Sequence, residues 1–93
     1  MYNKFEIVFD SNKNLRNVDK HDGVSLARAA DFDWDTAFIW HDLRYDYQEH
    51  RMSGIGYIGN RLFHVAFVDR GEQRRIISLR KANKREEKRY AEA

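Results

Sequence analysis

The sequence predicts an α+β fold: an N-terminal strand and two short helices, then a sheet built as an antiparallel meander, and a basic helix at the C-terminus. Apolar and polar side chains alternate near the N-terminus and again in the second half of the chain, which is the period of strands. Residues that cap helices stand at Asp10, Ser25 and Asn83. Short turn signals, Gly59-Asn60 and Arg70-Gly71-Glu72, separate the later strands. We expect residues 1–93 to form one domain.

The front of the chain is predicted to hold one strand and two short helices. Residues Phe5 to Phe9 alternate as a strand does. Asp10 can accept hydrogen bonds from the first turn of a helix of about ten residues, and Asp22-Gly23 ends that helix. Ser25 can cap a second, short helix, whose inward stripe is predicted to be Leu26, Ala29 and Ala30.

The sheet is expected to form from strands at Ala37 to Trp40, Arg51 to Ile58, Leu62 to Val68 and Arg74 to Arg80. A polar loop is expected between the first two of these, over residues 44–50. Regular alternation in the last strand puts Ile77 and Leu79 on one face with Arg75, and we expect those two apolar side chains to be buried. The other face would hold Arg74, Ile76, Ser78 and Arg80.

A basic helix is predicted directly after this strand. Asn83, followed three residues later by Glu86, is a capping-box pattern, so the helix should begin there and continue to about Tyr90. The arginine-fenced strand and the helix would then present guanidinium groups side by side. Because a planar guanidinium pairs well with phosphate, we expect an anionic partner.

The composition excludes several kinds of site. The chain has no cysteine, which rules out disulfides, thiolate nucleophiles and cysteine zinc sites. No metal-ligand, nucleotide-binding or serine-nucleophile motif is found, so we expect no cofactor and no metal. No apolar run approaches the roughly 18 residues of a membrane span, and the N-terminus shows no signal segment. We expect a cytoplasmic protein with no membrane partner.

Charge is distributed unevenly along the chain. Residues 1–50 carry six basic and ten acidic residues, a net charge of −4, whereas residues 70–93 carry nine basic and four acidic ones, a net charge of +5. A basic end is typical of proteins that bind a nucleic-acid backbone. A solvated helix with local ion pairs would show the same charges. The acidic front half is open to two interpretations, a protein-binding surface or solubilising charge, and its residues include Asp31, Asp33, Asp35, Asp42 and Asp46.

The histidines differ in the roles that their positions suggest. His21 ends the first helix, where a cation complements the helix dipole and where it could also transfer protons. His64 shares a strand face with apolar residues, so we interpret it as a packed, hydrogen-bonded residue and not as a catalyst. His41 is interpreted as structural.

Arginine, histidine, lysine and glutamate without a metal suit the cleavage of RNA. The 2′-OH of RNA can attack the adjacent phosphate, so the protein needs to supply a base, an acid and cations. Any anion-binding surface would carry similar residues, and the inventory is therefore suggestive and not specific.

The sequence also resembles a known family, the BrnT-type toxins of bacterial type II toxin–antitoxin systems. The likeness extends from about Phe5 to Tyr90 and is carried by Asn17-x-x-Lys20-His21, Gly23-Val24-Ser25, Gly56, Arg75-Ile76-Ile77-Ser78-x-Arg80-Lys81-Ala82, Arg85-Glu86 and Tyr90. The resemblance implies a compact RelE-like fold and a metal-independent endoribonuclease toxin. It also implies neutralisation by a cognate antitoxin of ribbon-helix-helix type, and operator DNA bound only through that antitoxin.

Site residues follow from the resemblance together with the chemistry. Arg80, Arg75 and Arg51 would bind phosphate, and His21 or His50 would be the acid, with Glu49 or the other histidine as the base. The family's Glu-Arg pair is altered here, because His50 directly precedes Arg51 and Glu49 stands one position earlier. The RNA backbone would be held by Lys20, Lys81, Lys84, Arg85 and Lys88.

Two other functions remain open at the level of sequence. The basic patch could belong to a non-catalytic module that binds nucleic acid or an acidic protein segment. The chain could also be a degenerate toxin that keeps only its antitoxin contact, with the altered His50 position as the cause.

Overall fold

The computed structural model describes residues 5–44 and 48–93. Its elements in chain order are β1 (Glu6–Val8), α1 (Ser11–Lys20), the 3₁₀-helix η1 (Leu26–Asp31), β2 (Phe38–His41), β3 (Arg51–Ile58), β4 (Arg61–Arg70), β5 (Gln73–Lys81) and α2 (Lys84–Glu92). The expected α+β class and the C-terminal helix are confirmed. The loop expected over residues 44–50 lies partly outside the described residues. Within the described ranges, no helix is long and apolar enough to cross a membrane.

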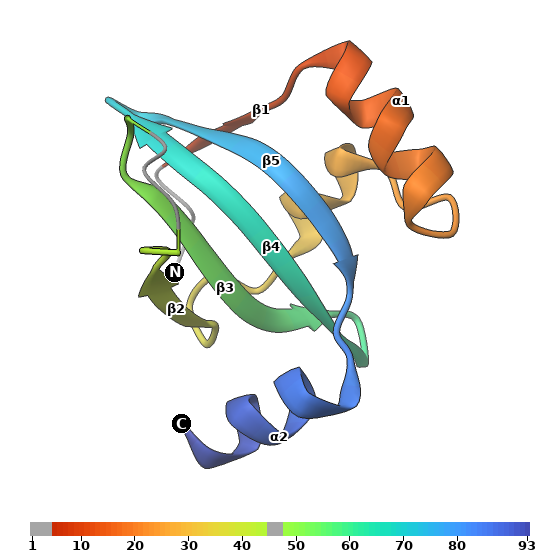
Figure 1. Cartoon of the computed structure of the whole chain (residues 1–93), viewed down its shortest axis with the longest axis vertical. Coiled ribbons are helices and arrows are strands. Elements are labelled where there is room, and N and C mark those ends of the chain that lie inside the picture. The colour runs from red at the N-terminus through yellow and green to blue at the C-terminus, as the bar shows by residue number, and fades with distance from the viewer. Residues whose placement is uncertain (1–4, 45–47) are drawn as a thin grey trace.

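The sheet has five strands in the order β1-β5-β4-β3-β2 (Figure 1). Strands β2 to β5 form the expected antiparallel meander. The expectation of a purely antiparallel sheet was wrong, because β1 pairs with β5 in parallel, with Glu6 opposite Gln73 and Val8 opposite Arg75. The meander leaves one edge of β5 open, and the first strand of the chain fills that edge.

Helix η1 covers one face of the sheet and closes the main core. Leu26 and Ala29 of η1 are fully buried against apolar side chains of the sheet, among them Phe63, Val65, Phe67, Ile76 and Leu79. Ala30, predicted to face inward, is exposed. A 3₁₀-helix has three residues per turn, so positions i and i+3 face the core and the next residue turns to solvent.

A β-bulge at Ile77 changes which residues of β5 face the core. Ala66 pairs with Ser78 and Phe67 pairs with Ile76, so two residues of β5 span one step of β4. Ile76 and Leu79 are fully buried, whereas Ile77 is only partly buried. The predicted burial of Ile77 was therefore wrong, because an extra residue in the strand reverses the alternation beyond it.

Helix α1 lies beside β5 and is fastened there by Asn17 (Figure 1). The buried Asn17 amide donates hydrogen bonds to the carbonyl oxygens of Val24 and Leu79, both at 2.8 Å. Its oxygen accepts a hydrogen bond from the Leu79 N–H at 3.2 Å. Asp10 caps the helix as predicted, accepting from the N–H groups of Asn12 and Lys13.

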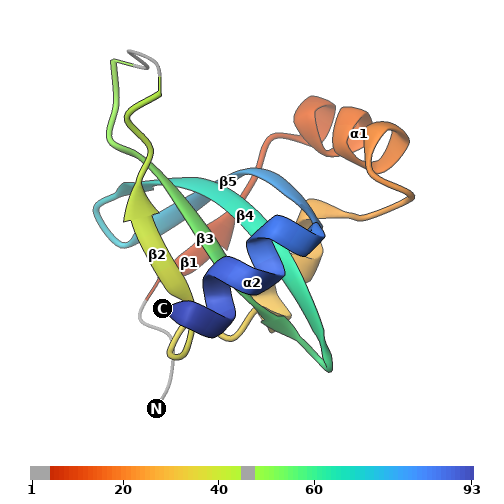
Figure 2. The same cartoon turned by 60° about the horizontal axis from the view of Figure 1, so that its bottom comes forward.

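Helix α2 packs across one end of the sheet face that η1 leaves open (Figure 2). Tyr90 of α2 contacts a small apolar cluster formed by Ile55, Leu62 and Ala82. The predicted capping box is confirmed, with Asn83 and Glu86 exchanging hydrogen bonds of 2.8 and 3.0 Å. The open face of the sheet is thus bordered by α1 along β5 and by α2 at one end.

Candidate active site

The open face of the sheet brings together the three arginines that the sequence predicted as site residues, from two strands. Arg51 and Arg75 lie in one cross-strand row, on either side of Val68. Arg80 lies in a second row, directly opposite His64. In a regular strand, residues 75 and 80 would point to opposite faces, and the bulge at Ile77 puts them on the same one. We call this surface the arginine face and define it by Arg51, Arg75 and Arg80.

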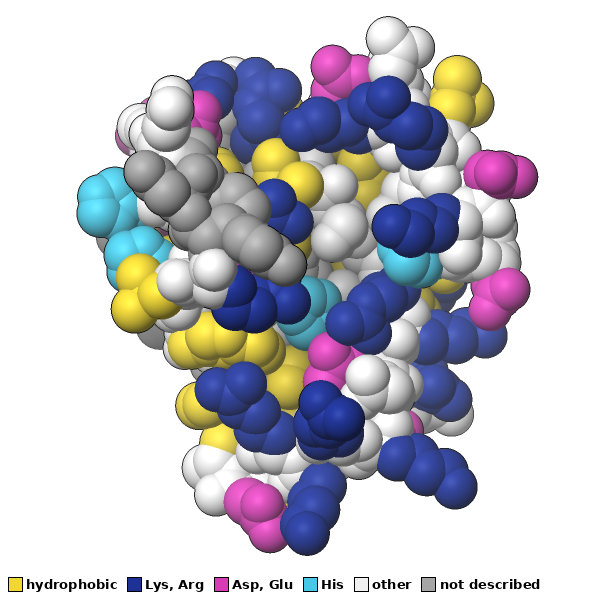
Figure 3. Space-filling model, in the orientation of Figure 1, with side chains coloured by type: hydrophobic (Ala, Val, Ile, Leu, Met, Phe, Trp, Pro, Cys, Tyr) yellow, Lys and Arg dark blue, Asp and Glu magenta, His cyan; other side chains and the backbone are white. Residues whose placement is uncertain are grey.

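Positive side chains gather around a hollow in this face (Figure 3). The hollow lies over the sheet between α1 and α2, and histidine and hydrophobic side chains are visible inside its basic rim. Guanidinium and ammonium groups around a concave surface raise the local concentration of anions. The rim therefore fits a polyanionic substrate.

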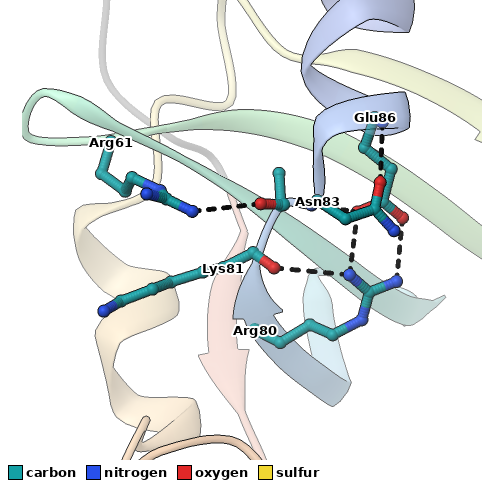
Figure 4. Close-up of polar contacts among 6 residues, drawn as sticks. Arg61, Arg80, Lys81, Asn83 and Glu86 are labelled. Carbon is teal, nitrogen blue, oxygen red and sulfur yellow. Dashed lines mark hydrogen bonds and ion pairs between the residues drawn. The ribbon is translucent and has the colours of Figure 1, made fainter.

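Arg80 is held at the junction between β5 and α2. Its two terminal nitrogens pair with both carboxylate oxygens of Glu86, each at 2.8 Å (Figure 4). The same carboxylate accepts from the backbone N–H of Asn83. Burial opposes the ionisation of Glu86, but the hydrogen bonds from Arg80 and Asn83 outweigh it and lower the pKa of Glu86. Arg80 is therefore fixed in place by the cap of α2.

His64 lies at the floor of a pocket of about 260 Å³ beside Arg80. We call it the His64 pocket, and it is lined by Trp40, Arg44, Ser53, His64, Arg80, Asn83, Arg85, Glu86 and Arg89. The histidine is only 9% exposed. Burial, reinforced by the charge of Arg80, lowers the pKa of His64 to about 4. At neutral pH the imidazole is therefore uncharged.

The nitrogen Nδ1 of His64 is buried and has no hydrogen-bond partner within residues 5–44 and 48–93. The expected packing of His64 is confirmed, but the expected hydrogen bonding is not seen at this nitrogen. His64 was not among the site residues predicted from the sequence, because its apolar neighbours on β4 resemble those of a core position. Its cross-strand pairing with Arg80 exists only in the assembled sheet, so the sequence carried no signal for this role.

Arg51 and Arg75 line a second pocket, of about 190 Å³, together with Glu49. Asp42 lies below Arg51, 3.9 Å from its Nε, and also pairs with Arg44 at 3.0 Å. Asp42 is only 4% exposed. Asp42 therefore anchors arginines of the site. The sequence suggested that it belongs to a protein-binding surface or adds solubilising charge, and a buried carboxylate fits neither interpretation.

His21 and Lys20 line a third pocket, of about 300 Å³, between α1 and β5. Ser78 and Ile77 form its other wall. Burial lowers the pKa of His21, and the positive charges of Arg80 and Lys20 lower it further. His21 is thus a partly buried imidazole that is neutral at pH 7 and feels the charge of Arg80.

The other sequence-predicted residues are more dispersed. Glu49 is ion-paired with Arg70, and His50 is exposed and stacks on His41 at 5.1 Å between ring centroids. Lys81 pairs across the strands with the core residue Phe63 and points away from Arg80 (Figure 4). Exposed positions on α2 are occupied by Lys84, Arg85 and Lys88, and Arg85 lines the His64 pocket.

This arrangement can bind phosphates and move protons. Guanidinium groups can stabilise the charge that builds up on a phosphate under attack, and a neutral imidazole can accept a proton near pH 7. Among the described residues, no cluster of three or more histidine, aspartate or glutamate side chains could hold a metal ion.

Comparison with known proteins identifies the family. The model of the ribonuclease toxin BrnT of type II toxin–antitoxin systems matches residues 9–86. That match includes every strand from β2 to β5 and all three arginines of the arginine face. No match was found among curated proteins. A type II system pairs the toxin with an antitoxin that neutralises it, and the target of a ribonuclease toxin is RNA. The chain belongs to the BrnT family of ribonuclease toxins.

Proposed function

We propose that this toxin cleaves RNA on the arginine face, through attack of a ribose 2′-OH on the adjacent phosphate and without a metal ion. The observation that carries the proposal is the bulge at Ile77, which puts Arg75 and Arg80 on one face with Arg51. Three guanidiniums there can hold the phosphate and offset its growing negative charge. In this reaction the 2′-oxygen bonds to phosphorus as the bond from phosphorus to the 5′-oxygen breaks. The products are a 2′,3′-cyclic phosphate and a free 5′-OH.

In this proposal His21 accepts the proton of the 2′-OH. Its lowered pKa keeps the imidazole neutral at pH 7, as a base requires. With His21 as the base, the leaving 5′-oxygen takes a proton from His50, the other histidine predicted from the sequence. Glu49 lines the pocket of Arg51 and Arg75 and is ion-paired with Arg70, so it is not the proton donor in this proposal.

The test is cleavage of RNA by the purified chain with EDTA present. Wild type is expected to cut and to leave 2′,3′-cyclic phosphate ends. Arg80→Ala is expected to lose activity by about 100-fold or more, the effect of removing one transition-state donor. Lys81→Ala is the matched control, because Lys81 is the adjacent cation and points to the other face. Equal activity of folded Arg80→Ala and wild type would overturn the proposal.

Three features of the family resemblance also belong to this proposal. We infer a RelE-like arrangement of the catalytic face, an antitoxin of ribbon-helix-helix type, and operator DNA bound through that antitoxin. We also infer that the toxin acts in the cytoplasm, where its RNA target is found. The five-stranded mixed sheet with a basic helix at its end supports the first of these. A crystal structure of the complex with the antitoxin tests the first two together.

A further inference from the structure

We propose that the His64 pocket is a nucleobase subsite, which holds the base of a ribonucleotide whose phosphate lies on Arg80. The inference rests on the proposed function, because it extends the RNA-binding surface from phosphates to a base. The pocket and the arginine face share Arg80, so a base in the pocket belongs to a nucleotide at or next to that arginine.

The first argument is the unpartnered nitrogen at the pocket floor. His64 is 9% exposed and its Nδ1 has no hydrogen-bond partner in the described part of the chain. Leaving a buried polar atom unpaired destabilises a fold, and such atoms are rare in folded proteins. His64 lines the pocket, although this nitrogen is not exposed there, so a ligand with a hydrogen-bonding edge would pair with it once the ring turns. Nucleobases have donors and acceptors along their edges.

The second argument is the planar wall of the pocket. The guanidinium of Arg89 lies over the indole of Trp40, with its carbon 4.1 Å from the ring centroid. The Trp40 ring in turn meets the edge of His64, with ring centroids 5.9 Å apart. Proteins that recognise single-stranded RNA stack its bases on aromatic rings and guanidinium planes. A phosphate alone would gain little from such a wall.

The third argument is that the charged side chains lie at the rim of the pocket and uncharged ones at its floor. The basic lining residues Arg44, Arg85 and Arg89 are exposed, whereas Ser53 is 2% exposed beside the neutral His64. A nucleotide has the same division, with a charged phosphate at one end and an uncharged planar base at the other. The pocket therefore fits a base on its floor and a phosphate at its rim.

The experiment is a titration of the full chain with nucleoside 5′-monophosphates, followed by the two indole N–H signals in NMR spectra. These ligands have no phosphodiester bond, so the measurement does not depend on cleavage. Trp40 lines the pocket. Trp34 is the internal control, because its indole donates to the Ala29 carbonyl under the opposite face. We expect at least one nucleotide to shift the Trp40 signal and leave the Trp34 signal in place.

Inorganic phosphate is titrated in parallel. If phosphate alone moves the Trp40 signal as far and at the same concentration, the pocket is an anion site and the nucleobase proposal is overturned. Absence of any Trp40 shift with all four nucleotides at millimolar concentration overturns it too. Neither outcome affects the proposed function, which is tested separately by RNA cleavage in wild type and Arg80→Ala.

His64→Phe tests the role of the imidazole, since it keeps an aromatic ring and removes both nitrogens. We expect it to weaken nucleotide binding by about tenfold, the effect of one lost base contact. His41→Phe changes an exposed histidine on β2 in the same way; it is the matched control and should bind as wild type. Ser53→Ala gives a second test of the floor should His64→Phe not fold. Wild-type affinity in folded His64→Phe and in Ser53→Ala would overturn the proposal.

Discussion

The two histidines of the arginine face differ in how far they are removed from water. His21 is partly buried between α1 and β5, whereas His64 is almost fully buried beneath the pocket. Burial is the main cause of the lowered pKa in both cases, and Arg80 adds to it in both. We therefore expect the titration of His21 to appear in the pH dependence of the reaction rate. The titration of His64 should appear in the pH dependence of the free energy of unfolding.

For His21, we predict an acidic limb in the pH profile of kcat/KM. A base must be deprotonated to act, so activity should fall as the pH drops through the pKa of His21. That pKa is lowered, which puts the midpoint of the limb below pH 6.5. The measurement is cleavage of a short RNA between pH 4 and 8.

His21→Ala should remove this limb and reduce the rate by about 100-fold or more, as loss of a general base does. His41→Phe, which keeps a ring stacked on His50, should leave the profile unchanged. A limb that persists in His21→Ala would assign it to another group and contradict the role of His21 as the base.

For His64, we predict a loss of stability on acidification. The unfolded chain takes up a proton near pH 6.5, whereas the folded chain resists it until about pH 4. Between these values the unfolded state binds more protons, so the free energy of unfolding falls as the pH falls. A shift of this size corresponds to about 3 kcal/mol. Urea denaturation at pH 7 and pH 4 measures it.

The matched variant is His64→Phe, which has no group to protonate at this position. Between pH 7 and pH 4, the free energy of unfolding of this variant should fall less than that of wild type. The variant should escape most of the loss predicted for protonation of His64. An equal change in both proteins would show that other groups cause the acid sensitivity.

At the scale of elements, the contact between η1 and β3 depends on Gly56. A Cβ at this position would lie 2.6 Å from Cζ of the buried Phe32 ring. The ring is packed in the core and is not free to move aside. We predict that Gly56→Ala lowers the free energy of unfolding by about 1–3 kcal/mol, the usual cost of overpacking.

Urea denaturation at pH 7 measures this cost. Gly59→Ala is a control for the loss of a glycine: nothing lies within 4 Å of an added Cβ, and only the positive φ of +61° opposes the change. Gly59→Ala should cost about 1 kcal/mol, the lower end of the cost of a left-handed conformation for a residue with a Cβ. A smaller loss for Gly56→Ala than for Gly59→Ala would contradict the close packing of β3 on Phe32.

Elements with a local signal could be predicted from the sequence, and those that depend on distant partners could not. The caps of α1 and α2 were predictable because Asp10 and the Asn83-Glu86 pair satisfy backbone groups within three residues. The parallel pairing of β1 was not, since three residues of strand do not specify which edge they join.

The bulge at Ile77 was not predictable because two adjacent isoleucines can each serve as the core residue. Alternation in sequence does not decide between them, whereas the sheet does, by burying Ile76 and Leu79. For the same reason the sequence named Arg75 and Arg80 as site residues but put them on opposite faces. His64 was missed because burial beside an arginine is a property of the assembled sheet.

At the scale of the whole molecule, the uneven charge along the chain gives a positive electrostatic potential on one side. Arginines and lysines from α1, β5 and α2 border the same hollow (Figure 3). We predict that RNA binding weakens steeply with salt, because each neutralised phosphate releases counterions. Arg85→Ala should reduce the slope of log K against log salt by about 0.7, the value for one contact to a single strand.

Lys81→Ala is again the control, because Lys81 is exposed and basic like Arg85 but points to the η1 side of the sheet. Its slope should equal that of wild type. The measurement is fluorescence anisotropy with a labelled RNA in the Arg80→Ala background, which prevents cleavage. Equal slopes for Arg85→Ala and Lys81→Ala would contradict a binding surface on the arginine face.

The extra residue in β5 also bears on how this strand can change length. On each side of Ile77 the side chains alternate regularly, but the two alternations are out of phase by one residue. Deleting Ile77 would bring them into phase, with Ile76 and Leu79 still buried and Arg75 and Arg80 still on one face. Deleting Leu79 would instead point the polar side chain of Ser78 toward the core. Family members with a shorter fifth strand are therefore expected to lack a residue at the position of Ile77.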